Sequence, residues 1–294
     1  MTTPSQINPP RSSRQQRGAA IIIMVLILML GLITLFTFRL DRRGPELEAD
    51  RKTALALAQA KEALLGRASS DNHPGSLPCP DTDDDGATQA FVGINCPSYI
   101  GRLPWRDLGL PDLRDGQGER LWYKLSRNFR DHANPINATT TGTLSISGTG
   151  AMNGLTAIVF SPGAPLANQV RDLAHMNDLT AYLEGYATVA DLNFNASPGG
   201  PINDHSISIS PIEIVNKAVP RVAAEIRDAL SSIPYPMMQP TLPSWVNNNS
   251  WDITYTQQSN TSTRMTFNSG CASVYQFSWD NANGLTVMTR IGTC

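Results

Sequence analysis

The sequence predicts an α+β fold in which a long N-terminal transmembrane helix packs on an antiparallel-sheet body, with a small C-terminal β-meander. Three observations support this fold. A run of 20 residues from Ala19 to Phe38 contains no charged side chain, and residues 46–68 are dense in strong helix formers. Residues 251–294 hold four short alternating stretches separated by turn residues. We therefore divide the chain into segments 1–18, 19–68, 69–245 and 246–294.

The apolar run is long enough to cross a bilayer. Twenty residues at 1.5 Å per residue span about 30 Å, the thickness of the hydrocarbon core. The run is longer than the apolar region of an ordinary secretory signal, and no small-x-small cleavage site follows it. We therefore expect a single spanning helix that stays with the protein.

A second helical stretch follows the apolar run. Gly44 and Pro45 predict a break or kink between the two, because proline disfavours helix at the preceding residue. Beyond this point, four apolar residues share one helical face: Leu57, Ala60, Leu64 and Ala68. We expect this face to pack on the body.

The body alternates short strand-like segments with polar loops. Leu121 and Tyr123 alternate as a strand does, and further strands are predicted at 143–146, 155–160 and 206–209. Helices are predicted at 170–184 and 212–232, with a boundary or kink at Pro220. In the last segment, the turn at 281–284 joins the final two strands of the meander.

The four cysteines all lie beyond the apolar run, at Cys79, Cys96, Cys271 and Cys294. Four cysteines allow three pairings. We favour Cys79–Cys96 and Cys271–Cys294, since each closes a loop of about 20 residues, worth on the order of 3 kcal/mol. Four reduced, buried cysteines are the alternative. Zinc is disfavoured because there is no C-x-x-C pair and no Cys/His cluster.

An acidic segment between the first two cysteines matches half of a calcium loop. Asp81, Asp83 and Asp85 alternate and Gly86 follows, as in the D-x-D-x-D-G pattern. The second half of the calcium-loop pattern does not match, because Val92 occupies the position where a bidentate Glu is expected. The segment predicts either a calcium site closed by the flanking cysteines or a solvated acidic turn.

Composition and motifs exclude several function classes. The net charge is −2, with no basic stripe, which argues against nucleic-acid binding. No nucleophile elbow, zinc-protease pair, phosphate loop or dinucleotide fingerprint occurs, so we do not expect an enzyme. The four histidines (73, 132, 175 and 205) are scattered without ligand spacing.

The junction at Arg17-Gly18-Ala19 resembles the type IV prepilin signal, in which a basic leader ending in glycine meets the apolar segment directly. The resemblance implies that prepilin peptidase cuts between Gly18 and Ala19 and methylates the new N-terminus. Ile23 departs from the family, since most pilins have Glu at the fifth mature position. In lacking this Glu, the chain resembles the minor pseudopilin at the tip of type II secretion pseudopili.

The resemblance implies a minor structural subunit of a type IV pilus or type II secretion pseudopilus, with other pilin subunits as partners. Cys271–Cys294 also resembles the C-terminal disulfide loop of pilins. The basic leader and the cysteines favour a single-pass inner-membrane protein with a cytoplasmic N-terminus and a periplasmic body. The alternative is a membrane-anchored periplasmic enzyme or binding protein.

Overall fold

The structure is a computed structural model that describes residues 16–132, 136–186, 188–197, 202–231, 244–249, 251, 253–259, 261–267, 274–280 and 284–291. Residue contacts divide the chain into two units, 1–50 and 51–294. The boundaries predicted at residues 18, 68 and 245 stay predictions.

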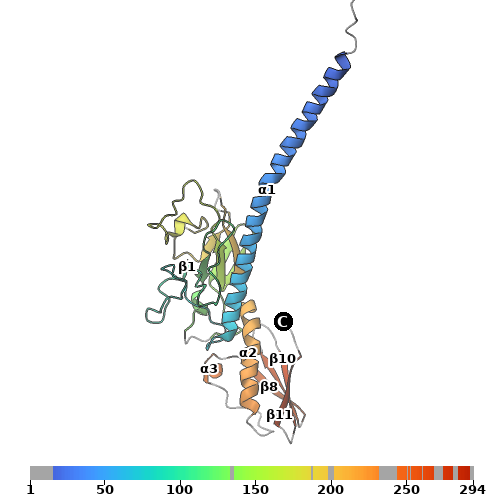
Figure 1. Cartoon of the computed structure of the whole chain (residues 1–294). Coiled ribbons are helices and arrows are strands. Elements are labelled where there is room, and N and C mark those ends of the chain that lie inside the picture. The colour runs from blue at the N-terminus through green and yellow to red at the C-terminus, as the bar shows by residue number, and fades with distance from the viewer. Residues whose placement is uncertain are drawn as a thin grey trace, which may run out of the picture. The chain divides into compact units, whose positions relative to one another are not determined.

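The longest helix, α1, runs from Gln16 to Ser70 and belongs to both units (Figure 1). It continues through Pro45, so the break predicted there does not occur. Proline removes one backbone hydrogen bond, and the rest of a helix of 55 residues outweighs that loss.

The predicted fold class and location need correction. Among the described residues, no helix combines the length and apolar character that crossing a membrane requires. The α+β class with a transmembrane helix is therefore wrong, and so is the single-pass inner-membrane location. By number of elements the described part is mostly sheet, with eleven strands and three α-helices.

The second unit is built around a four-stranded antiparallel sheet of order β1-β2-β5-β7. Its strands are β1 (Ile100–Arg102), β2 (Trp122–Leu125), β5 (Ala157–Ser161) and β7 (His205–Ile209). Side chains that alternate along β2 and β5 pack into two different hydrophobic cores, one on each face of the sheet. Tyr123 and Val159 join the buried face of α1, formed by Leu57, Ala60, Leu64 and Ala68 as predicted.

The opposite face of this sheet is also covered. Trp122 and Phe160 pack with a three-stranded sheet of order β4-β3-β6 and with the segment around Tyr186. These strands are β3 (Leu144–Ser147), β4 (Met152–Leu155) and β6 (Asn193–Asn195), and β3 pairs with β6 in parallel. Burial on both faces explains why β5 is a continuous apolar run and does not alternate.

The helix predicted at 170–184 is not formed. Only two 3₁₀ turns occur among the described loops, η1 (Arg127–Phe129) and η2 (Leu179–Ala181). Tertiary contacts of Arg171 explain why no α-helix forms in this region. Its buried guanidinium donates hydrogen bonds to the carbonyl oxygens of Gly163 and Ala181, at 2.7 and 2.8 Å. These tertiary contacts replace the local helical ladder.

Helix α2 (Pro211–Ser231) begins with Pro211 in its first turn. Glu213 reaches back to the backbone N–H and hydroxyl of Ser210, both at 2.9 Å, as in a capping box. The helix passes through Pro220, so the predicted boundary there is wrong. Its apolar face, which includes Val222 and Ile226, continues on both sides of that proline.

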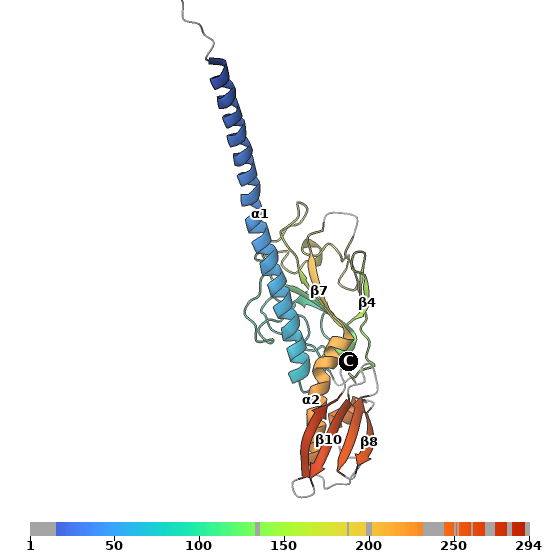
Figure 2. The same ribbon diagram turned by 90° about the vertical axis from the view of Figure 1, so that its right-hand side faces the viewer.

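The C-terminal sheet is a meander of order β11-β10-β9-β8 that lies against α2 (Figure 2). The strands are β8 (Ile253–Ser259), β9 (Ser262–Phe267), β10 (Val274–Asp280) and β11 (Gly284–Arg290). A short helix, α3 (Ser244–Asn248), adds Val246 to the shared core. The predicted meander is therefore present.

Candidate functional site

The first candidate surface is the apolar part of α1, residues 20–35, which we call the apolar segment. Every large apolar side chain described in it is more than half exposed, from 53% at Val25 to 68% at Met24. Its exposed residues point in all directions around the helix axis, so the segment has no polar face. A helix of this kind is stable in water only when other apolar surface surrounds it.

The one polar side chain of the apolar segment is satisfied within the helix. The Thr34 hydroxyl lies 3.0 Å from the Leu30 carbonyl oxygen and 2.9 Å from that of Gly31. A hydroxyl that bonds back to its own helix needs neither water nor a partner group. Ile23 is apolar and exposed like its neighbours, so no carboxylate interrupts the segment. The segment is therefore suited to complete burial.

The predicted processing junction lies at the start of this helix. Gly18 and Ala19 fall within the bounds of α1. Cleavage between them stays a prediction.

The second candidate site is the acidic loop that follows the cysteine at position 79. A disulfide joins Cys79 to Cys96, and both residues are buried. The favoured pairing of these two cysteines is therefore present. Cys271 and Cys294 lie outside the described residues, so their pairing stays a prediction.

Asp81 holds the acidic loop in shape with its own carboxylate. Its Oδ1 accepts hydrogen bonds from the backbone N–H groups of Asp83 and Asp84, at 3.1 and 2.7 Å. Its Oδ2 accepts one from Gly86 at 2.7 Å, and Gly86 has a positive φ of 86°. Burial raises the pKa of Asp81, although the N–H groups of Gly86 and Asp84 oppose the shift. The carboxylate therefore stabilises the turn through these three hydrogen bonds.

One oxygen each from Asp81, Asp83 and Asp85 lie within 4.8 Å of one another. Asp83 and Asp85 are exposed, and both accept hydrogen bonds, from Gln89 and from the backbone of Ala87. The predicted residues are thus brought together, and each carboxylate has partners within the loop. Calcium binding there stays a prediction.

Two arginines fasten the acidic loop to the central sheet. Arg120 pairs with Asp84 at 2.9 Å, and Asp84 is the one described residue other than glycine with positive φ. The buried Arg102 exchanges backbone hydrogen bonds with Asp81, and its guanidinium lies 4.3 Å from the ring centre of Trp122 and 4.1 Å from that of Tyr182. These contacts make the loop a rigid part of the fold.

Three sites with titratable side chains in the second unit were not predicted from the sequence. Burial lowers the pKa of Lys124 to about 8, and its ammonium donates to the Val189 carbonyl oxygen at 2.7 Å. The second is the carboxyl pair of Glu184 and Asp204. The third is a cluster of Asp71, His73 and Asp131. Long-range contacts create all three, and only the short spacing of Asp71 and His73 is visible in the sequence.

The Glu184–Asp204 pair makes stability fall as pH rises. Burial, followed by the charge of Glu184, raises the pKa of Asp204 to about 8. Since an unfolded Asp titrates near 3.9, the folded state binds one additional proton between about pH 4 and pH 8. This stabilisation is complete below pH 4 and is lost as the pH rises through about 8.

We predict that Asp204→Asn removes this dependence. The free energy of unfolding of the parent should fall by about 1.4 kcal/mol per pH unit relative to the variant, between about pH 5 and pH 7. Urea unfolding at several pH values measures the difference. Asp228→Asn, at a side chain that is 63% exposed, is the control. Parallel curves for the parent and Asp204→Asn would contradict the prediction.

Comparisons with known protein families, characterised proteins and solved structures give no match for this chain.

Proposed function

We propose that this protein is a structural subunit of a filament, similar to a minor pilin or pseudopilin. In this proposal the apolar segment is buried against the N-terminal apolar segments of neighbouring subunits. The exposure of the apolar segment around its whole circumference carries the proposal. A single groove covers one side of a helix, whereas a bundle of like helices covers all sides.

Two further features support the proposal. The exposed segment continues, within α1, into a stretch that packs on an antiparallel sheet, which resembles the organisation of pilins. The Gly18-Ala19 junction resembles the prepilin cleavage signal at the start of the same helix. The proposal uses burial between subunits and does not require the helix to cross a membrane.

Ile23 narrows the proposed role. An ionised Glu at this place would need a positive partner within the filament core, since an unpaired charge in apolar surroundings costs several kcal/mol. The apolar Ile23 needs no such partner. We therefore assign the chain to a minor position, where a subunit has no neighbour above it.

Photo-cross-linking tests the proposal. We expect benzoylphenylalanine in place of Ile27 to give protein–protein products in cells that assemble the filament, because this position would face a neighbouring helix. The matched control is benzoylphenylalanine in place of Leu173, which is 89% exposed outside the apolar segment and should give no such product. Equal yields at both positions, or no product at position 27, would overturn the proposal.

A further inference from the structure

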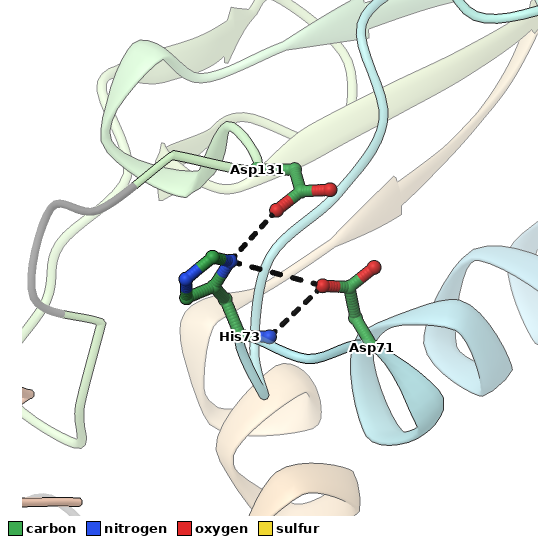
Figure 3. A group of neighbouring side chains, drawn as sticks. All are labelled: Asp71, His73 and Asp131. Carbon is green, nitrogen blue, oxygen red and sulfur yellow. Dashed lines mark hydrogen bonds and ion pairs between the residues drawn. The ribbon is translucent and has the colours of Figure 1, made fainter. Parts of the chain in front are cut away.

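We propose that Asp71, His73 and Asp131 form a binding site for a divalent transition-metal ion of the zinc class. We call these three residues the Asp–His–Asp cluster (Figure 3). The proposal is independent of the filament function, since all three residues lie outside the apolar segment. The expected role of the ion is to fasten the end of α1 to the loop that follows η1.

The backbone brings the three residues together. Asp71 and His73 follow directly after Ser70, the last residue of α1. Asp131 lies 58 residues beyond His73 and follows η1. Leu77 connects the two segments, since its N–H donates to the Phe129 carbonyl oxygen at 2.8 Å and its own carbonyl accepts from Asp131 at 3.0 Å. The cluster therefore stands on paired backbone and not on a free loop.

The ligand atoms already converge. The Nδ1 atom of His73 lies 3.1 Å from Oδ1 of Asp131 and 4.0 Å from Oδ1 of Asp71. Figure 3 shows both carboxylates directed at this nitrogen. Metal–ligand bonds of about 2.0–2.2 Å place neighbouring ligand atoms roughly 3–4 Å apart. Small side-chain movements are enough to bring all three atoms within bonding distance of one ion.

Arg67 holds the outer oxygens of both carboxylates. It forms an ion pair with Oδ2 of Asp71 and another, at 3.2 Å, with Oδ2 of Asp131. With Arg67 on the outer oxygens, Oδ1 of Asp131 faces the imidazole, and Oδ1 of Asp71 accepts a hydrogen bond from the backbone N–H of His73 at 2.9 Å. Such outer partners orient the ligands of metal sites. The two carboxylates and the one guanidinium carry a summed charge of −1, which favours a cation beside the imidazole.

The donor set selects the class of metal. A mixed site of one imidazole nitrogen and two carboxylate oxygens suits zinc and similar ions, whereas calcium and magnesium prefer oxygen ligands alone. Asp71 is buried, while the side chains of Asp131 and His73 are 28% and 42% exposed. An ion from solution can therefore reach the cluster, and further coordination positions remain for water.

Cobalt spectroscopy tests the site, because Co²⁺ substitutes for Zn²⁺ and its visible absorption reports protein ligands. We expect the full-length protein to bind one Co²⁺ with a ligand-field spectrum, and Zn²⁺ to displace it. His73→Ala and Asp131→Asn should each weaken binding at least tenfold and remove the spectrum.

Two matched controls separate this site from other contacts. His175→Ala removes a histidine that lies 2.6 Å from a single carboxylate, Asp172, and Asp83→Asn changes the acidic loop. Both should leave Co²⁺ binding unchanged, and melting curves without metal should show each variant folded. The proposal is overturned if the parent binds no Co²⁺ at micromolar protein, or if His73→Ala binds it as the parent does. It is also overturned if Asp83→Asn alone removes binding.

Discussion

Leu26→Asp, Ile27→Asp and Leu28→Asp are each expected to abolish assembly of the protein into large species. Successive helix positions are about 100° apart, so these three substitutions sample three sides of the apolar segment. All three side chains are more than half exposed in the described structure. If neighbouring helices surround the segment, each new carboxylate becomes buried without a partner, at a cost of about 3–5 kcal/mol. Association should then weaken by roughly 10²–10⁴-fold.

Sedimentation of the filament-forming complex measures this effect. Leu173→Asp, at a position that is 89% exposed in the second unit, is the control and should assemble normally. Sensitivity at only one of the three positions would contradict a surrounding bundle and indicate a one-sided groove. Normal assembly of all three variants would remove the apolar segment from the interface.

Cys79→Ser combined with Cys96→Ser should lower the free energy of unfolding by about 3 kcal/mol. The disulfide closes a loop with a sequence separation of 17, and opening it increases the conformational freedom of the unfolded chain. Both cysteines are buried in the core that also contains Leu64 and Leu103, so the substitution also leaves polar hydroxyls there. The loop remains paired with β1 through Asp81, so we expect weakening and not complete unfolding.

Urea denaturation of the double variant, compared with the parent protein with and without reductant, measures this loss. The reduced parent should approach the stability of the double variant, which is the internal control. A difference below about 0.5 kcal/mol between the variant and the oxidised parent would show that the disulfide contributes little.

Local patterns in the sequence predicted the elements whose own residues decide their structure. The spacing of Leu57, Ala60, Leu64 and Ala68 located the buried face of α1, and strict alternation located the C-terminal meander. The Cys79–Cys96 pair followed from loop length. In each case the deciding residues lie close together in the chain.

Elements decided by distant contacts were not predictable. Residues 170–184 have a helical composition, yet Arg171 binds carbonyl groups of neighbouring loops and no α-helix forms. The prolines at 45 and 220 did not end their helices, because packing and helix length outweigh one missing hydrogen bond. The transmembrane prediction was wrong, since no helix among the described residues has the length and apolar character that crossing a membrane requires.

The candidate sites also include one that local sequence predicted and one that depends on distant contacts. The acidic loop was visible as Asp81, Asp83 and Asp85 in alternation, whereas the structure added the arginines that fasten it. The Asp–His–Asp cluster needs Asp131, which only the pairing of Leu77 with the segment after η1 brings to His73. Histidines that are scattered in the sequence can therefore still lie beside carboxylates in the fold.

Identification of the peptide cross-linked to position 27 tests the proposed assembly most directly. Mass spectrometry of the product formed by benzoylphenylalanine at this position should find an apolar N-terminal helix segment, either residues 20–35 of another copy or the equivalent segment of a related subunit. A peptide from the folded domain of an unrelated protein would contradict the account. So would the absence of any cross-linked peptide from assembled material.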